Sequence, residues 1–314
     1  MADKEAPERL AADDAGIARA AELIRGGRLV AVPTETVYGL AGRADSQEAV
    51  AAIFRAKGRP DFNPLIVHVA SLAMAKELAV MDNRAQQLVA RYWPGPLTMV
   101  VPLRPDAPIA RAVTANLPTV ALRMPDHPAI RRLLDEVGMP LAAPSANRSG
   151  AVSPTSADHV AASLGQRVDA IIDGGPCARG LESTIIALRG DGAWQLLRPG
   201  PIVGEELAAL LGPASPLRDA GIEAPGQLTR HYSPGKPIRL NVQTAGPGEF
   251  LIGFGRVQGD CSLSADGDLS LAAARLYDCL HQAAESPQPL IAVAPIPLSG
   301  LGAAINDRLT RAAA

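Results

Sequence analysis

The sequence predicts an α/β protein: a mixed, twisted open sheet with flanking helices, followed by a second, smaller α/β domain. Short apolar runs of strand type alternate with stretches of helical spacing, which is the pattern of helices packed on a sheet. Two strand-like runs between 184 and 197 follow one another without a helix, so we expect a mixed sheet rather than a regular doubly wound one. A shift to Pro, Gly and Ser around 212–237 separates the smaller domain.

The larger domain is expected to cover residues 13–211. Its first helix, 13–25, has apolar residues at helical spacing and stops at Gly26-Gly27, a helix-ending signal. Asp45 and Glu48 have the spacing of a capping box for a helix that ends near Gly58, and a cap from Thr155 to Asp158 opens a later helix. The other expected elements are strands at 29–32, 65–69, 97–103, 120–124, 141–143, 170–172, 184–188 and 195–197, two helical stretches up to residue 91, and a helix at 128–137.

The remaining residues divide into a tail, a linker and the second domain. Residues 1–12 are predicted to be a flexible tail, and the Pro- and Gly-rich stretch 212–237 a linker or lid. Residues 238–314 are predicted to form a compact α/β unit with strands at 250–253 and 290–294 and helices at 269–284 and 301–313.

Composition limits the classes of function. Of 314 residues, 47% are hydrophobic and 20% charged, which is typical of a globular chain. The net charge of −2 argues against strong direct binding of nucleic acid. The first ten residues lack an apolar run and the longest apolar stretches fall short of about 20 residues, so we expect neither a signal peptide nor a membrane span. Three cysteines without metal-type spacing favour reduced thiols in the cytoplasm.

Several common catalytic motifs are missing. The sequence contains no G-x-x-x-x-G-K-[ST], so ATP would not be held by a P-loop, and it contains neither G-x-S-x-G nor H-E-x-x-H. Gly300-Leu301-Gly302 opens a predicted helix after a strand, but the third glycine of a dinucleotide fingerprint is absent, and packing explains it better. We predict no metal site formed by side chains.

The segment 57–64, K-G-R-P-D-F-N-P, places two cations around a glycine at a predicted helix end. A solvated basic helix end, favourable for the helix dipole, is the simpler interpretation when the segment is taken alone. A rigid loop that presents Lys57 and Arg59 close together also suits a polyphosphate, with the lysine as a point charge and the arginine as a fork. His68 follows on a predicted strand, where a lone histidine is more often a core residue than a ligand.

Polar loops follow several predicted strands. Residues 143–150 (A-P-S-A-N-R-S-G), 174–184 and 198–200 (R-P-G) each bring Ser, Asn, Gly or Arg to a strand end. Each is ordinary turn chemistry by itself. Since α/β sheets bind ligands at the carboxyl ends of strands, these loops together make a site plausible without identifying its substrate.

Read together, the motifs resemble the YrdC-like threonylcarbamoyl-AMP synthases in their longer, two-domain form. The matching motifs, in order, are P-T-E-T-V-Y-G-L (33–40), K-G-R-P-x-x-x-P-L-I-V-H (57–68), W-P-G-P-L-T (93–98), V-A-L-R-M-P (120–125), P-S-A-N-x-S-G (144–150), E-S-T-I (182–185), L-R-P-G (197–200), A-P-G-x-L-x-x-H-Y-x-P (224–234) and G-L-G-A-A-I-N-D-R (300–308). The resemblance covers nearly the whole chain, and it implies a YrdC-like sheet domain followed by a Rossmann-like C-terminal domain.

The resemblance implies an activity: condensation of L-threonine, bicarbonate and ATP to threonylcarbamoyl-AMP with release of pyrophosphate, for threonylcarbamoyladenosine in tRNA. By the family's pattern, L-threonine would contact Thr36, His68, Arg123, Ala143 and Ser183. ATP would contact Lys57, Arg59, Asn63, Thr119, Ser145, Asn147, Ser153, Arg198 and Tyr232, and Lys57 and Arg59 would serve catalysis.

Physical requirements fit these assignments. Arg123 can meet the carboxylate of threonine with two hydrogen bonds. The amine adds to bicarbonate to give a labile carbamate, whose oxygen attacks the α-phosphorus of ATP in line. Catalysis is then mainly positioning and charge neutralisation by Lys57, Arg59 and Mg²⁺ carried with the nucleotide. A lid that excludes water is required, for which the linker with His231-Tyr232 is the natural candidate. The product would pass to the tRNA threonylcarbamoyl-transferase complex.

Two other functions remain open from the residues alone. An RNA-binding module without ATP turnover would use the same fold, but the net charge and the aromatic content of 3% leave few stacking platforms. A carbamoyl-transfer domain of a hydrogenase-maturation protein shares the core motifs, but it would need accessory zinc-finger and acylphosphatase regions that this chain lacks.

Overall fold

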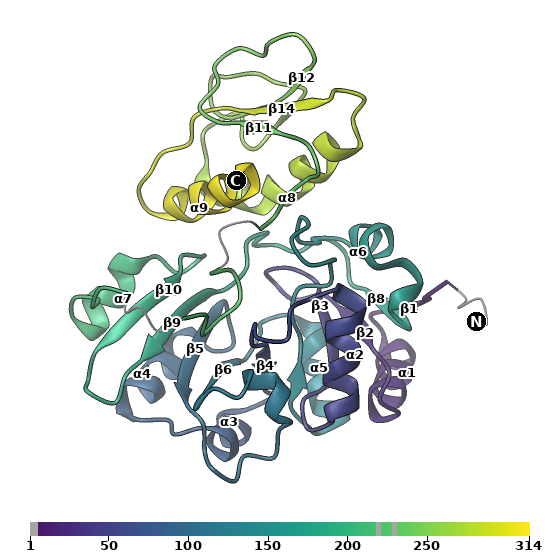
Figure 1. Cartoon of the computed structure of the whole chain (residues 1–314), viewed down its shortest axis with the longest axis vertical. Coiled ribbons are helices and arrows are strands. Elements are labelled where there is room, and N and C mark those ends of the chain that lie inside the picture. The colour runs from purple at the N-terminus through teal and green to yellow at the C-terminus, as the bar shows by residue number, and fades with distance from the viewer. Residues whose placement is uncertain (1–5, 218–220, 228–230) are drawn as a thin grey trace.

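The computed structural model describes residues 6–217, 221–227 and 231–314 (Figure 1). It confirms the predicted α/β class, with a mixed ten-stranded sheet and a separate four-stranded parallel sheet among these residues. Residues 1–5 of the predicted tail, and 218–220 and 228–230 of the predicted linker, lie outside the described residues. None of the helices within the described ranges is long and apolar enough to cross a bilayer.

The larger sheet has the order β1-β8-β2-β3-β7-β4-β6-β5-β9-β10. Its strands are β1 (Glu8–Ala11), β2 (Val30–Val32), β3 (Gly39–Arg43), β4 (Ile66–His68), β5 (Leu97–Pro102), β6 (Thr119–Arg123), β7 (Leu141–Ala142), β8 (Ala170–Asp173), β9 (Thr184–Leu188) and β10 (Trp194–Arg198). The neighbours β9 and β10 are antiparallel, as the absence of a helix between them predicts. The helices are α1 (Asp14–Arg25), α2 (Gln47–Lys57), α3 (Leu72–Leu78), α4 (Asn83–Tyr92), α5 (Pro128–Val137), α6 (Ala157–Leu164) and α7 (Gly204–Leu211).

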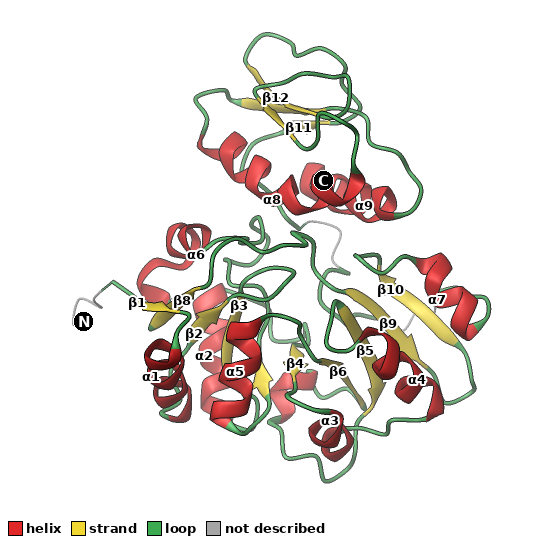
Figure 2. Cartoon of the chain, turned by 180° about the vertical axis from the view of Figure 1, so that it is seen from behind, coloured by secondary structure: helices red, strands yellow, loops and turns green. Residues whose placement is uncertain are grey.

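Amphipathic helices cover this sheet. In α1 the Asp13 side chain accepts from the Gly16 amide and starts the helix, and Ile17, Ala20 and Ile24 are buried on one face. That face packs beside α5 and against β8 and β2 (Figure 2). The helix stops at Gly26, as predicted.

Two predicted helix caps are displaced by one residue. Ser46, not Asp45, caps α2, because Arg43 takes both carboxylate oxygens of Asp45 at 2.9 Å. Ser156, not Thr155, caps α6, while the Thr155 hydroxyl contacts the His159 ring. Because Arg43 binds the Asp45 side chain, Ser46 is the polar residue that remains to cap α2.

The predicted flexible tail of residues 1–12 is wrong for residues 8–11. These residues form the edge strand β1, which pairs in parallel with β8 from Glu8 opposite Ala170 to Ala11 opposite Asp173. The exposed, charged side chains of an edge strand give no alternating apolar pattern, so the sequence did not reveal it.

The second domain is a small parallel sheet with two long helices. Its elements are β11 (Ile238–Arg239), β12 (Glu249–Gly253), β13 (Cys261–Ser262), β14 (Leu290–Val293), α8 (Leu269–Glu285) and α9 (Leu301–Ala313), with the sheet order β11-β14-β12-β13. In Figure 1, α8 and α9 lie between this sheet and the larger domain. Val37, Val152 and Leu181 of the larger domain join the apolar core that α8 and α9 build, so the two domains share a packed interface.

Candidate functional site

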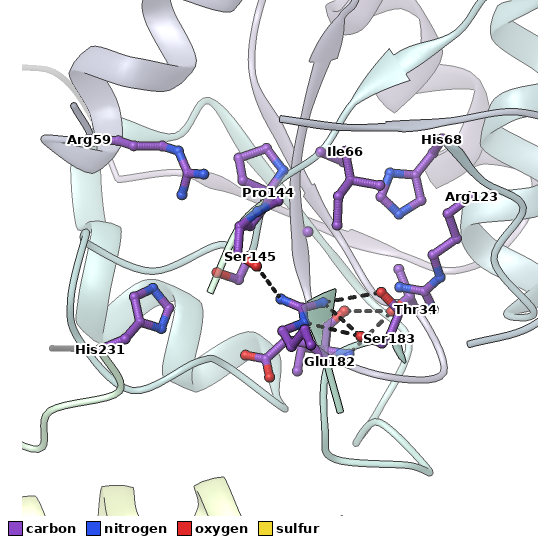
Figure 3. A pocket seen from close by; sticks show the side chains of 15 residues that line it. Thr34, Arg59, Ile66, His68, Arg123, Pro144, Ser145, Glu182, Ser183 and His231 are labelled. Atoms are coloured by element: carbon purple, nitrogen blue, oxygen red, sulfur yellow. Dashed lines mark hydrogen bonds between the residues drawn. The ribbon is translucent and has the colours of Figure 1, made fainter. Parts of the chain in front are cut away.

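The loops at the strand ends meet around one pocket (Figure 3), as the sequence predicts. Several separate segments of the chain contribute to it. The residues that line it are Thr34, Val37, Gly39, Arg59, Ile66, His68, Arg123, Ala143, Pro144, Ser145, Glu182, Ser183, Arg198, Pro225 and His231. Arg59 and His231 lie on one side of this close-up view, and His68 and Arg123 lie on the other.

The parallel pair β4 and β6 aligns several of the predicted site residues. His68 lies opposite Arg123, and Ile66 lies opposite Ala121. Thr119 is two residues further back on β6, on the same face as Ala121 and Arg123 because side chains alternate along a strand. With about 3.3 Å per residue, Thr119 lies roughly 13 Å from Arg123 along the strand. A ligand group at Thr119 and another at Arg123 would therefore lie in line along β6.

Cations gather at the first end. The α2 helix ends at Lys57 because Gly58 takes the left-handed conformation there, and this turn directs Arg59 into the pocket. The Arg59 guanidinium donates to the Asn63 side-chain oxygen at 2.6 Å and to the Pro64 carbonyl at 2.9 Å. The Lys57 ammonium donates to the carbonyls of Ser145 and Asn147, the latter at 2.6 Å, and so ties the two loops together.

Arg198 completes this group from the end of β10. Its guanidinium donates to the Ser183 carbonyl at 2.9 Å and to the Ser183 hydroxyl at 3.1 Å. The hydroxyl of Ser183 also contacts that of Thr98 at 2.7 Å. Burial lowers the pKa of Lys57 well below its ordinary value, with a further contribution from Arg59, and lowers the pKa of Arg59 to about 10, with a further contribution from Arg198. The positive charges are thus unfavourable as they stand, and a bound anion would relieve them.

The second end is balanced in charge. The Arg123 guanidinium donates to the Glu35 carboxylate at 2.6 Å, and the other Glu35 oxygen accepts from the Asp126 amide. Burial, followed by the charge of Arg123, lowers the pKa of His68 to about 3, so its ring is neutral at physiological pH. Both ring nitrogens of His68 are buried without a hydrogen-bond partner among the described residues. A ligand with a donor or acceptor would satisfy them.

Glu182 is an acidic residue in the pocket wall whose two oxygens are both engaged. One accepts from the Ser153 hydroxyl at 2.5 Å, and the other accepts from the Tyr277 hydroxyl at 2.7 Å and from Arg308 at 3.0 Å. Although burial raises its pKa, the charges of Arg308 and Arg198 lower it further, to about 2. A carboxylate held in this way is a poor candidate for a general base.

Part of the linker closes the pocket. Pro225 and His231 line it, and Ala224 packs on Ile66 and Ala121. Gly226 adopts a φ of +86°, and a Cβ there would lie 2.8 Å from Cδ of Arg198, so only glycine fits this close approach. The cavity left open has a volume of about 40 Å³, room for a few water molecules rather than a nucleotide.

Seven of the predicted site residues line this pocket: Arg59, His68, Arg123, Ala143, Ser145, Ser183 and Arg198. Lys57, Asn63 and Ser153 lie directly behind it and are hydrogen-bonded to residues of its wall. Thr36 contacts the wall residue Thr34 at 2.8 Å, and Asn147 accepts from Lys57. Tyr232 is buried beside the linker glycine Gly226, and Thr119 is half-buried at the start of β6.

The sequence reasoning missed ionisable members of the site, namely Glu35, Glu182, Arg308 and Tyr277. Glu35 stands inside the T-E-T motif, so its buried ion pair with Arg123 had a local signal. Arg308 belongs to the last motif, but only the folded chain shows its contact with Glu182.

The described residues contain no cluster of three or more His, Cys, Asp or Glu side chains that could hold a metal ion. In the pocket the oxygens of Glu182 and Glu35 are already bound by the chain's own donors. These residues therefore do not fit a metal held by the protein itself.

Two family models match consecutive parts of the chain between residues 22 and 314. Residues 22–200 match the model described as "Telomere recombination", and residues 202–314 match that of the "Threonylcarbamoyl-AMP synthase, C-terminal domain". Together they account for both domains.

Known proteins are similar to the chain over nearly their whole length. A threonylcarbamoyl-AMP synthase of Bacillus subtilis is 40% identical over 333 residues, covering 98% of this chain and 95% of the relative. That of Pyrococcus abyssi is 38% identical, covering 93% and 92%. The crystal structure of P. abyssi Sua5 complexed with L-threonine has a TM-score of 0.88 at 35% identity and covers 98% of this chain and 97% of that one.

Proposed function

This chain belongs to the two-domain threonylcarbamoyl-AMP synthase family, and we propose that its pocket is where L-threonine, bicarbonate and ATP are condensed. The enzyme is a nucleotidyltransferase that serves threonylcarbamoyladenosine modification of tRNA. One observation carries the assignment of the pocket: a group of cations with an excess of positive charge shares the pocket with a charge-balanced arginine and a neutral histidine.

The triphosphate binds at the cation end. Arg59 and Arg198 line that end and Lys57 lies just behind it, so a polyanion there gains charge-assisted hydrogen bonds. Ser145, Asn147, Ser153 and Asn63 hold the surrounding loops, and Thr119 and Tyr232 bound the space for the nucleoside. The buried Tyr232 hydroxyl has no partner among the described residues, which supports a role toward the nucleotide.

Threonine binds at the other end. Its carboxylate pairs with Arg123, whose charge Glu35 already compensates, so an amino acid zwitterion adds no net charge. His68 and Ser183 are placed to hydrogen-bond its polar groups, with Thr36 and the Ala143 backbone beside them.

The geometry supports an ordered condensation. The threonine amine adds to bicarbonate, with loss of water, to give a carbamate. A carbamate oxygen then attacks the α-phosphorus of ATP between the two ends, and the bond to pyrophosphate breaks. Lys57, Arg59 and Arg198 stabilise the charge that develops on the phosphates. The residues 221–227 and 231–237 act as a lid that moves to admit both ligands and then excludes water from the carbamate.

Mg²⁺ is proposed to arrive bound to the nucleotide phosphates, since the pocket carboxylates are engaged. The product's lability requires hand-off to the tRNA threonylcarbamoyl-transferase complex. Three unpaired cysteines in the described residues and the tRNA-related role support the cytoplasm as the place of action.

The test is release of pyrophosphate from ATP by the purified chain without RNA. We expect release that requires both threonine and bicarbonate. Salt-sensitive RNA binding without ATP turnover would instead support the RNA-binding alternative.

A further inference from the structure

We propose that Arg308, in the second domain, is a positioning residue for the active site: it holds Glu182 and Pro199, and through them it aligns their chain neighbours Ser183 and Arg198 in the pocket. The proposal rests on the proposed function of this pocket. It gives the final motif of the sequence, residues 300–308, a task other than contact with substrate.

Arg308 is fully buried on α9 and every nitrogen of its guanidinium is engaged. Nε donates to Glu182 at 3.0 Å, one terminal nitrogen donates to the Pro199 carbonyl at 2.9 Å, and the other donates to Asp307 at 2.6 Å. The guanidinium also lies over the ring of Tyr232, 5.4 Å from its centre. One side chain of the second domain thus touches three segments around the pocket.

The two contacts to the larger domain are each one residue from a pocket residue. Glu182 precedes Ser183, and Pro199 follows Arg198. Ser183 and Arg198 in turn are joined by hydrogen bonds from the guanidinium of Arg198. A shift of Arg308 would therefore change the relative placement of an expected threonine contact and an expected phosphate contact.

The interface around this contact is tightly packed. Gly180 approaches α8 so closely that a Cβ there would lie 2.4 Å from the Ala274 carbonyl oxygen. Tyr277 on α8 donates to Glu182 beside Arg308. Two helices of the second domain therefore fix the same carboxylate, and the segment 180–183 has little room to move.

Burial of the Arg308–Glu182 ion pair costs free energy. Removing a carboxylate and a guanidinium from water costs several kcal/mol per ion, and apolar residues would hold an interface as well. Asp307 and the hydroxyls of Tyr277 and Ser153 add the hydrogen bonds that make the pair tolerable. A buried charge at the domain interface, next to the pocket, is better explained by precise placement than by adhesion.

The experiment replaces Arg308 with methionine in the full chain, with Arg239→Met as the matched control. Arg239 pairs with Glu249 on the outer side of the second domain and touches no pocket residue in the contacts that the structure gives. We expect Arg308→Met to lower kcat/KM for threonine-dependent pyrophosphate release about 30- to 100-fold, mainly through kcat. The control should remain within about twofold of wild type.

The pH dependence of activity distinguishes a positioning role of Arg308 from a role that only holds the two domains together. The charged and titratable groups that face Glu182 are Arg308, Arg198, Tyr277, Tyr232, Lys57 and His231. Without Arg308, the pKa of Glu182 should rise, because burial raises it and one of the two arginine charges that lower it is gone. Activity should then acquire an acid limb at a higher pH than any limb of the wild type. The double variant Glu182→Gln/Arg308→Met should lose that limb.

Three results would overturn the proposal. One is a normal rate in Arg308→Met, and another is a lower rate without an acid limb. If Arg308→Met does not fold, Tyr277→Phe decides: a drop of about fivefold in kcat at normal thermal stability supports the proposal, and an unchanged kcat overturns it. An inactive wild type would refute the proposed function instead, and calorimetric binding of threonine and an ATP analogue would then test whether Arg308 shapes the pocket.

Discussion

The two ends of the pocket use arginine in different ways. At one end Arg59 and Arg198 donate to neutral oxygens of loops and strand ends. At the other end Arg123 donates to the carboxylate of Glu35. The first arrangement leaves positive charge in excess, because Glu182, which also pairs with Arg308, only partly offsets Lys57, Arg59 and Arg198. The second is neutral before any ligand binds.

This difference teaches how one small cavity can sort two ligands. A polyphosphate gains most free energy of binding where positive charge is in excess, because burial has already removed the competing water. A zwitterion gains little binding free energy there. Its carboxylate can still hydrogen-bond to the guanidinium of Arg123, whose charge Glu35 balances. Sorting by net charge needs no separate chambers, since both arrangements of arginine line the same pocket.

Loss of a cation at the first end should have the largest effect. Arg59→Ala is expected to lower kcat/KM for ATP about 100- to 1000-fold, because the developing phosphate charge loses a fixed donor. Lys57→Ala should act in the same direction. Arg55→Ala, an exposed arginine on the same helix, is the matched control. Steady-state pyrophosphate release and a thermal melt measure activity and folding, and near-normal activity of a folded Arg59→Ala would remove the 57–64 loop from the site.

Changes at the second end should affect threonine selectively. Arg123→Ala is expected to raise the KM for threonine about 100-fold and the KM for ATP less than about threefold. Because this variant leaves Glu35 without its partner, Glu35→Gln/Arg123→Gln serves as the charge-neutral comparison. Equal increases in both KM values would contradict the division between the ends.

The neutrality of the second end predicts a pH effect on stability. The pKa of His68 is about 3 in the folded chain and near 6.5 when unfolded, so the unfolded chain takes up the proton first as the pH falls. The free energy of unfolding should therefore decrease below pH 6.5, by on the order of 2 kcal/mol for His68 between pH 6.5 and 5. Denaturant unfolding of wild type and His68→Asn at pH 7 and pH 5 measures this contribution. Identical losses in the two proteins would mean that His68 is not held neutral.

The smallest effect is expected at Thr119. Thr119→Val removes one hydroxyl at the start of β6, so the KM for ATP should rise about fivefold, which corresponds to about 1 kcal/mol. The KM for threonine should not change, since Thr119 is four residues from Arg123 on the same strand. A rise in the threonine KM alone would reverse the proposed order of the ligands along β6.

Much of this arrangement could be predicted because the motifs are local. Lys57, Gly58 and Arg59 are consecutive, and a left-handed glycine after a helix is a signal that a short window contains. The strands β4, β6 and β9 are short apolar runs, and their polar ends identified most of the pocket.

Other features depend on contacts between residues far apart in the sequence, which no short stretch of sequence reveals. Tyr277 and Arg308 reach Glu182 across 95 and 126 residues of sequence. The strand β3 (Gly39–Arg43) contains two glycines, and β1 is charged and exposed, so neither has the composition of a strand. These two segments become strands because they pair with the neighbouring strands β8 and β2.

The most direct test of the division between the two ends is a crystal structure with L-threonine and a non-hydrolysable ATP analogue bound together. The account predicts the triphosphate beside Arg59 and Arg198, and the threonine carboxylate on Arg123 with His68 against its polar groups. A triphosphate on the Arg123–Glu35 pair, or a threonine carboxylate on Arg59, would contradict it.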